Sequence, residues 1–142
     1  MKLIFLGSVL GLLTLAGCKK DGNLVFMNDY YAASSMCAKG YTNSDIRIAE
    51  NSLKEFIAFL EKRQNEHPRE CLYATAVADE RLARLCEFAG RTNDATLWRH
   101  KRDQTAMELG LFVTFNPIHW ITNEISTVEP RLNPGWMKSQ GQ

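Results

Sequence analysis

Apolar residues recur at spacings of three and four from residue 44 to residue 109, and this pattern constrains the fold more than any other feature of the chain. It predicts an amphipathic helix over about 44–65, with an N-cap in the run 43–45 and an end before Pro68. The core-facing stripe of this helix is expected to consist of Ile46, Ala49, Leu53, Phe56, Ile57 and Leu60. Charged residues occupy its other face, so the stripe needs further helices to cover it.

Two further helices are expected before residue 110. Pro68 can be the first residue of one, over about 68–89, and the other runs over about 94–109; Gly90 and Gly110 follow their ends. The first carries apolar residues at Leu72, Ala76, Leu82, Ala83, Leu85, Cys86 and Phe88, with Glu80, Arg81, Arg84 and Glu87 expected to face solvent. The second carries Ala95, Trp98, Ala106 and Leu109. Together these helices predict an all-α domain.

The segments that flank these helices have weaker patterns. Residues 29–39 predict a short helix that Gly40 ends. Residues 111–136 are punctuated by prolines and predict an irregular segment with a helical turn at 118–121, followed by a frayed end at 137–142. We therefore expect a small helical bundle with a short irregular N-terminal tether and an irregular C-terminal segment.

Residues 1–18 have the organisation of a secretory signal. Lys2 precedes an apolar run, residues 3–15, that is too short to span a bilayer. The run closes with Leu15, Ala16, Gly17 and Cys18. These four residues resemble the lipobox of bacterial lipoproteins, in which the peptide is cut just before the cysteine, so the resemblance implies a signal peptide over 1–17.

The lipobox resemblance implies a location in the bacterial cell envelope. Cys18 would carry acyl chains such as palmitate, and the membrane would be a partner through this lipid. Residues 18–23 would form a tether to a helical domain over 24–136. Lys19 is not the aspartate associated with inner-membrane retention, which favours the outer membrane. An ordinary secreted protein of the periplasm or surface, with a chance cysteine at the cut, is the alternative.

The turn after the 68–89 helix resembles that of a tetratricopeptide repeat. Leu82, Ala83, Gly90 and Ala95 match the repeat pattern, whereas Asp79, Cys86, Arg99 and Met107 stand where Trp, Tyr, Phe and Pro are usual. One such unit is visible, and stacked arrays need about three. The resemblance implies a TPR-like helical hairpin with the 44–65 helix packed across it; an ordinary antiparallel hairpin with a glycine turn is the alternative.

The charge balance argues against nucleic acid as a partner. The chain has 17 Lys and Arg against 16 Asp and Glu, and removal of Lys2 with the signal leaves the mature chain formally neutral. Nucleic-acid-binding domains carry a clear basic excess. The densest basic cluster, 99–102, spreads around more than a full helical turn, so a solvated surface is favoured over a docking site for head groups or an acidic partner.

Three cysteines follow Cys18, and an odd number leaves at least one thiol without a partner inside the chain. Cys71 and Cys86 lie in one expected helix, about 22 Å apart, which is beyond the reach of a disulfide. A disulfide, if one forms, therefore uses Cys37, and Cys37 with Cys71 is the possible pair. Buried free cysteines are the alternative.

No motif for a metal, a cofactor or a nucleophile is present. His67 and Cys71 are four residues apart, but the helix begins between them, and no third ligand is near. Cys37 has Lys39 nearby, which can lower the pKa of a thiol, but no histidine accompanies it. We expect no metal and no cofactor. We expect the aromatic residues mainly in the core, with an exposed recognition patch or a membrane-facing edge as the alternative; they are Tyr30, Tyr31, Trp120 and Trp136.

The sequence therefore favours a non-enzymatic, lipid-anchored envelope protein that presents a helical surface to a protein partner. An envelope enzyme or enzyme accessory remains open. Its candidate carboxylates are Glu66, Glu70, Asp79, Glu80 and Glu87. Two carboxyls with raised pKa values in one cleft would favour the enzyme. A small-molecule or lipid carrier also remains open, and it needs an apolar cavity of about 300 Å³ or more.

Overall fold

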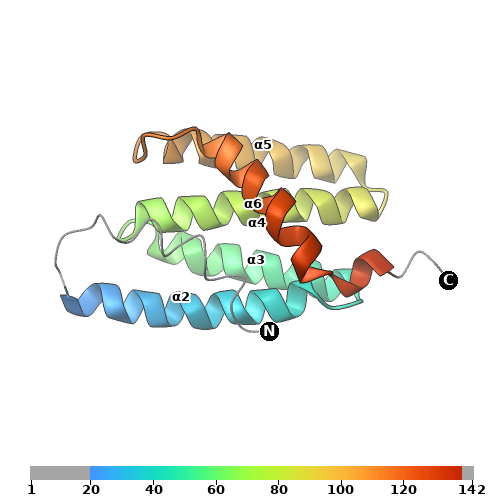
Figure 1. The fold of residues 1–142 in the computed structure, drawn as a ribbon, viewed down its shortest axis with the longest axis horizontal. Helices are drawn as coiled ribbons and strands as arrows, with labels where there is room; N and C mark the ends of the chain where they lie inside the picture. The colour runs from blue at the N-terminus through green and yellow to red at the C-terminus, as the bar shows by residue number, and fades with distance from the viewer. Residues whose placement is uncertain (1–19, 139–142) are drawn as a thin grey trace.

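The computed structural model describes residues 20–138, and the described chain is all-helical, as predicted. Its helices are α2 (Lys20–Tyr41), α3 (Ile46–Arg63), α4 (Pro68–Phe88), α5 (Thr92–Leu109) and α6 (Pro117–Leu132), followed by the 3-10 helix η1 (Gly135–Lys138). Helices α2 to α5 form a row in which each is antiparallel to the next, and α6 crosses this row obliquely (Figure 1).

The three strongly patterned helices form where the sequence predicts them, within two residues at each end. Asp45 caps α3 by accepting a hydrogen bond from the Arg47 backbone N–H at 2.8 Å. Pro68 opens α4, and Gly90 follows it with a φ of 74°, a left-handed conformation that glycine adopts without strain. The stripe predicted for α3 is buried, apart from the half-buried Ile46.

The predictions for the flanking segments are partly wrong. Helix α2 begins at Lys20, so residues 20–23 of the predicted tether are helical, and the helix continues through Gly40. The predicted irregular segment contains α6, which Asn116 caps by accepting from the His119 N–H. Pro130 is tolerated because it lies in the last turn, where a left-handed Asn133 ends the helix.

Helix α4 is the centre of the fold. It lies between α3 and α5 and beneath α6, and nearly all of its residues are buried. The expectation that Glu80 and Arg81 face solvent is wrong, since they are 6% and 2% exposed. Arg84 is half-buried, and Glu87 is exposed as predicted. The amphipathic argument assumes one packed face, whereas α4 is packed on three sides.

The C-terminal end of the described chain is fastened to the α2–α3 turn. Backbone N–H groups of Gly135 and Trp136 donate to Thr42 and Asn43 carbonyls at 3.0 and 3.1 Å. The buried Trp136 indole donates to the Tyr41 carbonyl at 2.9 Å. A Cβ on Gly135 would lie 3.0 Å from the Ser44 backbone nitrogen, so glycine is needed for this approach. Thus α6 is held at its far end as well as along its length.

The core assignment predicts large losses of stability on truncation. Leu53→Ala in α3 and Leu82→Ala in α4 each leave a cavity among fully buried neighbours. Each should lower the free energy of unfolding by about 2–5 kcal/mol, measured by urea denaturation. Leu97→Ala on the exposed side of α5 is the control and should change it by less than about 1 kcal/mol. A loss of that small size at Leu53 or Leu82 would contradict the assigned faces.

Candidate functional site

Helix α4 carries two buried polar faces with different surroundings. Residues two apart on an α-helix point about 200° apart, so Arg81 and Asp79 lie on opposite sides of α4. Arg81 faces α6, which covers it. Asp79 faces a groove lined by α3 and α5 alone. The covered face and the open face are described in turn, because they differ in what they can bind.

The covered face holds a buried ion pair. The Arg81 guanidinium donates through Nε to Glu129 Oε2 of α6 at 3.2 Å, and both side chains are 3% exposed. The Tyr41 hydroxyl at the end of α2 donates to the other oxygen of Glu129. The guanidinium carbon also lies 5.4 Å from the centre of the Tyr41 ring. These contacts tie α2, α4 and α6 together.

Burial disfavours the charged form of both members of this pair. Burial raises the pKa of Glu129 and lowers the pKa of Arg81, and the opposite charge of the partner acts against both shifts. Mutual attraction and the Tyr41 hydrogen bond offset this desolvation. Because α6 shields the pair from solvent, we assign it a structural role.

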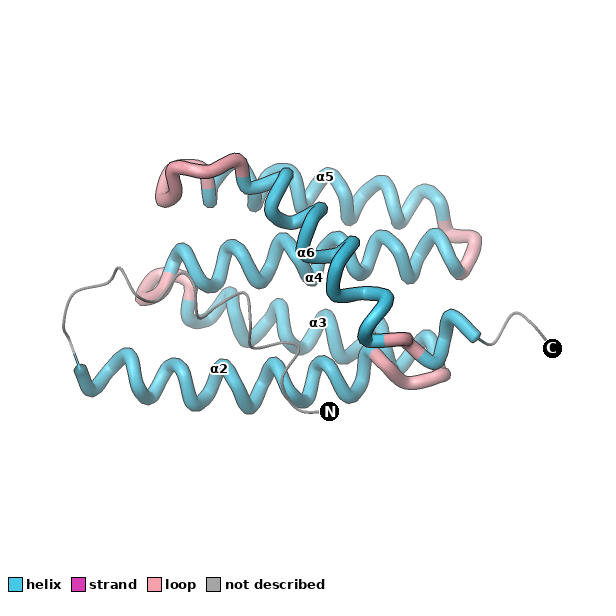
Figure 2. The backbone as a smooth tube through the Cα atoms, viewed as in Figure 1, coloured by secondary structure: helices cyan, strands magenta, loops and turns pink. Residues whose placement is uncertain are grey.

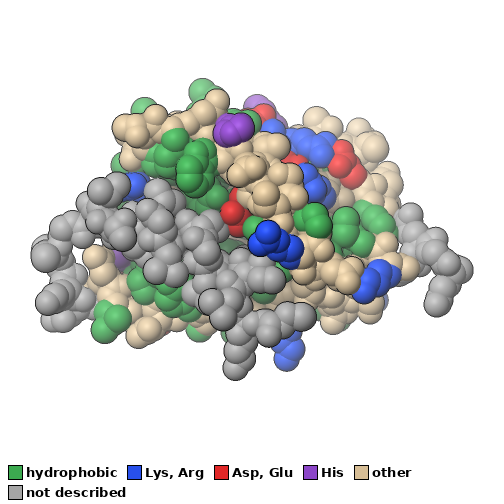
Figure 3. All heavy atoms as spheres, viewed as in Figure 1, with side chains coloured by type: hydrophobic (Ala, Val, Ile, Leu, Met, Phe, Trp, Pro, Cys, Tyr) green, Lys and Arg blue, Asp and Glu red, His purple; other side chains and the backbone are tan. Residues whose placement is uncertain are grey.

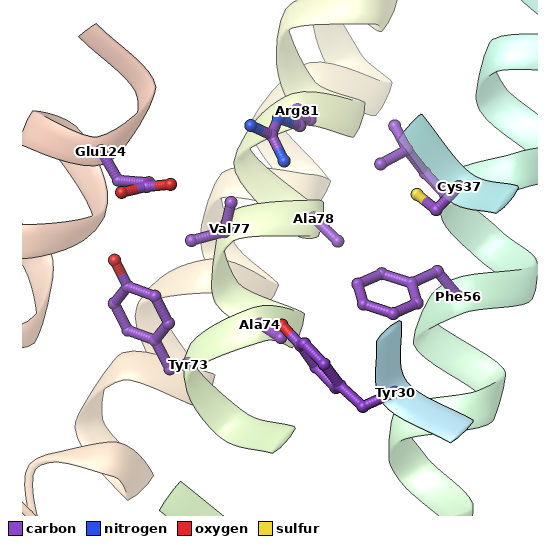
Figure 4. A pocket seen from close by; sticks show the side chains of 10 residues that line it. Tyr30, Cys37, Phe56, Tyr73, Ala74, Val77, Ala78, Arg81 and Glu124 are labelled. Carbon is purple, nitrogen blue, oxygen red and sulfur yellow. The ribbon is translucent and has the colours of Figure 1, made fainter. Parts of the chain in front are cut away.

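A small cavity adjoins the ion pair, between α2, α3, α4 and α6 (Figure 4). Its volume is about 20 Å³, enough for about one water molecule. The buried Tyr73 hydroxyl has no hydrogen-bond partner among the described residues and points toward Glu124 of α6 (Figure 4). Cys37 lies on the opposite wall, and burial raises the pKa of its thiol to about 12. Lys39 therefore does not activate Cys37, and this cavity is too small for a substrate.

The open face of α4 forms the floor of a groove of about 390 Å³. We call it the Asp79 groove. The residues that characterise it are Thr75 and Asp79 on the floor, Glu61 from α3, and Trp98, Lys101 and Glu108 from α5. Thr75 and Asp79 are one helical turn apart, so both side chains point into the same part of the groove.

Both floor residues lack the partners that buried polar groups normally have. Asp79 is 3% exposed, and no described residue forms a hydrogen bond or an ion pair with it. The buried Thr75 hydroxyl also has no hydrogen-bond partner among the described residues. Buried polar groups are nearly always hydrogen-bonded, and an exception at a solvent-open groove suggests that a ligand completes it.

The electrostatics of the groove favour a proton or a positive charge at Asp79. Burial raises the pKa of Asp79 to about 7, with the charge of Glu61 adding to the rise and that of Lys101 opposing it. The Lys101 ammonium lies 4.3 Å from the centre of the Trp98 ring, which is a cation–π arrangement. An ammonium or guanidinium group from a ligand would supply both the charge and the hydrogen bonds that Asp79 lacks.

The structure separates the five candidate carboxylates of the enzyme hypothesis. Asp79 lines the groove, whereas Glu80 pairs with Arg84 and Arg102 on the side toward α5. The exposed Glu87 pairs with Arg99. Two others lie near the start of α4: Glu66 contacts Arg63 at 3.9 Å and Glu70 is 9% exposed. The basic cluster 99–102 is thus divided among contacts inside the domain.

Three residues of the groove were not predicted from the sequence as site residues: Thr75, Trp98 and Lys101. A polar pair spaced by four within an apolar stretch of one helix, Thr75 and Asp79, was an available signal. Trp98 was assigned to the core and is half-buried. Its place beside Asp79 in the lining of the groove depends on how α5 packs against α4, which the sequence does not show.

The remaining predicted site residues fall into two groups. Cys18 and the cleavage motif Leu15, Ala16 and Gly17 lie outside the described residues. Cys37, Cys71 and Cys86 are all buried free thiols, so the possible bond between Cys37 and Cys71 is not formed in this structure. His67 stacks on Phe26 with ring centres 3.8 Å apart. Over residues 20–138, no three potential ligands from His, Cys, Asp or Glu gather around a common point.

Comparisons with protein-family models, curated proteins and solved structures found no match to this chain. The tetratricopeptide resemblance of the α4–α5 hairpin therefore stays a prediction. Between residues 20 and 138, no helix combines the length and apolarity needed to cross a membrane. A functional assignment consequently has to come from the chain's own residues.

The buried ion pair predicts a strong asymmetry between single and double substitutions. Glu129→Gln removes the charge that faces Arg81 but still accepts the Tyr41 hydrogen bond. It should lower the free energy of unfolding by about 3–5 kcal/mol in urea denaturation. The double variant Arg81→Met with Glu129→Gln should recover at least half of this loss, because no buried charge remains.

The control for this prediction is Glu87→Gln, which breaks the exposed pair with Arg99 on the same helix. It should change the free energy of unfolding by less than about 1 kcal/mol. A double variant that is as unstable as Glu129→Gln alone would contradict the role given to the pair.

The raised pKa of Asp79 predicts a pH-dependent stability. The folded chain holds the Asp79 proton up to a pKa of about 7, whereas an unfolded aspartate releases it near 3.8. The free energy of unfolding therefore falls as pH rises between these values. Asp79→Asn removes this contribution. The free energy of unfolding of the variant minus that of the unchanged protein should therefore be larger at pH 8 than at pH 5, by on the order of 1–3 kcal/mol. An equal effect at the two pH values, in urea denaturation, would show that Asp79 does not titrate in this range.

Proposed function

We propose that this protein is a lipid-anchored protein of the bacterial envelope, and that its helical domain binds a partner protein through the Asp79 groove. The observation that carries the binding site is Asp79 itself. It is a carboxyl at 3% exposure with no partner among the described residues, on the floor of a groove open to solvent. The role is non-catalytic, because the groove offers a recognition group without a converging catalytic set.

The anchor is supported by the sequence at the start of the chain. Leu15, Ala16, Gly17 and Cys18 follow an apolar run of the length of a signal peptide. Helix α2 begins at Lys20, so a chain cut before Cys18 would reach its folded domain within two residues. Acyl chains on Cys18 would hold that domain at the membrane surface, since two or more chains give stable retention.

The chemistry of the groove indicates the kind of partner. Asp79 needs a hydrogen-bond donor and a positive charge. The walls carry two acidic side chains and two basic ones, Glu61, Glu108, Lys54 and Lys101, so Asp79 leaves one negative charge in excess when it is ionised. A lysine or arginine side chain from the partner fits this need, and its stem can pack on Trp98 after Lys101 moves aside. The Thr75 hydroxyl supplies a further hydrogen bond. We therefore propose a partner that inserts a basic side chain.

Two observations bear on the alternatives. A carboxyl whose pKa is about 7 is suited to general acid–base catalysis, which favours an enzyme. The second carboxyl with a raised pKa, Glu129, lies across α4 beneath α6 and shares no cleft with Asp79. For a carrier, the enclosed cavity beside Arg81 is far below the volume needed, at about 20 Å³, whereas a groove of about 620 Å³ between α2 and α3 meets it. That groove includes the apolar side chains of Met36, Ile48 and Phe56, and it favours the carrier.

The test is cross-linking in intact bacterial envelopes with a C-terminally tagged chain, followed by mass spectrometry. The N-terminal peptide should begin at an acylated Cys18, and one dominant protein should co-purify. Asp79→Asn should reduce recovery of that protein at least tenfold at pH 8, because the neutral amide does not attract a cation. Cys18→Ala should release the chain from the membrane and lose the partner.

Glu87→Gln is the control, since Glu87 is an exposed carboxylate of α4 outside the groove. It should leave recovery unchanged. A partner recovered equally well with Asp79→Asn would place the interface elsewhere. An acylated chain without any partner would overturn the proposal in favour of the enzyme or carrier.

A further inference from the structure

The turn between α5 and α6 exposes a concentration of apolar side chains. Leu111 is 83% exposed, and Phe112 and Trp120 are each 46% exposed. Ile118 is 37% exposed, and Phe115 stacks on Trp120 with ring centres 4.8 Å apart. We call these five residues the turn patch. Figure 3 shows hydrophobic side chains gathered over this turn, at the upper left of the molecule.

The turn patch lies within a long uncharged stretch. From Gly110 to Asn123 the chain contains no Asp, Glu, Lys or Arg, although charged residues make up 23% of the whole sequence. A turn at the surface of a protein is ordinarily polar. The absence of charge together with exposed aromatic rings suits the boundary between water and lipid, where Trp is enriched.

The topology places this patch at the same end as the start of α2. Because α2 to α5 alternate in direction, the start of α2, the α3–α4 turn and the α5–α6 turn all lie at one end of the row (Figure 2). The first turns of α2 expose two more apolar residues there, Leu24 at 64% and Val25 at 57%. The apolar exposure is thus shared by two segments far apart in sequence.

The position of Cys18 in the sequence indicates that this end of the row of helices contacts the bilayer. Lys20, the first residue of α2, follows Cys18 by two positions, and two residue steps reach at most about 7 Å. Acyl chains on Cys18 would therefore hold this end of the row, and no other, against the bilayer. A lipid-exposed apolar element enters the head-group boundary by about 5–10 Å, a depth that suits an exposed turn and the first turns of a helix.

We propose that the turn patch inserts into the bilayer that holds the acyl chains of Cys18, giving the domain a second membrane contact and a fixed orientation. The inference rests on the lipid anchor of the proposed function. In this orientation the helices of the row stand away from the membrane, and the Asp79 groove opens to the side.

The test uses the full mature chain, purified with its lipid and reconstituted in vesicles of phosphatidylcholine and phosphatidylglycerol. Vesicles with bromine on the acyl chains near the head groups quench tryptophans that lie at that depth. The emission of Trp120 is obtained by subtracting the signal of a Trp120→Phe variant, since Trp98 and Trp136 also emit. It should fall at least twofold in brominated vesicles relative to plain ones.

Two variants distinguish insertion from a chance effect. Phe112→Asn places an amide in the patch and should reduce the quenching of Trp120 at least by half. Leu97→Asn changes a leucine that is 54% exposed, against 46% for Phe112, nearer the opposite end of the row, and it should leave the quenching unchanged. Both positions are exposed, so the variants should fold.

Mass spectrometry of the same sample separates the failure of this proposal from that of the anchor. An acylated Cys18 with equal Trp120 emission in both kinds of vesicle would overturn the second contact alone. Shielding of Trp120 from aqueous iodide without quenching by brominated lipid, in a chain that cross-links to itself, would show that a second copy covers the patch. A Cys18 without lipid would overturn the anchor and the contact together.

Discussion

The charge of Arg81 is the constraint on which the rest of this structure depends. An arginine at the centre of α4 can be buried only where groups of opposite polarity converge on it. Glu129 arrives from α6 and Tyr41 from the end of α2, so three helices that are distant in sequence meet at one guanidinium. The oblique path of α6 across the row follows from this requirement together with the apolar contacts of Ile121 and Ile125.

Two neighbouring ionisable residues of α4, Asp79 and Arg81, are both buried but differ in their surroundings. Arg81 is enclosed with Glu129 and belongs to the framework. Asp79, two residues earlier, is as little exposed but lacks a partner among the described residues. The difference arises because α6 covers one side of α4 only, leaving the other open between α3 and α5. The covered side stabilises the fold, and the open side is where we place recognition.

Sequence patterns predicted the buried face correctly for a helix that packs on one side. They did not predict the buried residues of a helix that is covered on several sides. The stripe of α3 was recovered because Leu53, Ile57 and their neighbours have polar residues opposite. The burial of Glu80 and Arg81 was not predicted. Their charged partners come from α5 and α6, and a local sequence pattern does not indicate partners on other helices. Helix α6 was missed because prolines normally end helices, whereas Pro117 begins this one and Pro130 lies in its last turn. Asp79 was among the candidates, but its groove exists only after α3 and α5 have packed.

The order in which the chain is synthesised gives the Arg81–Glu129 pair a further consequence. Helices α2 to α5 all precede Glu129 in the chain, so a row that forms before α6 has emerged holds Arg81 without the Glu129 carboxylate. Trp136, which fastens α6 at its end, follows a few residues later. Folding therefore reaches its final state only after the last segment has been made. A chain that ends before α6 would bury Arg81 without the Glu129 carboxylate, which would destabilise the row.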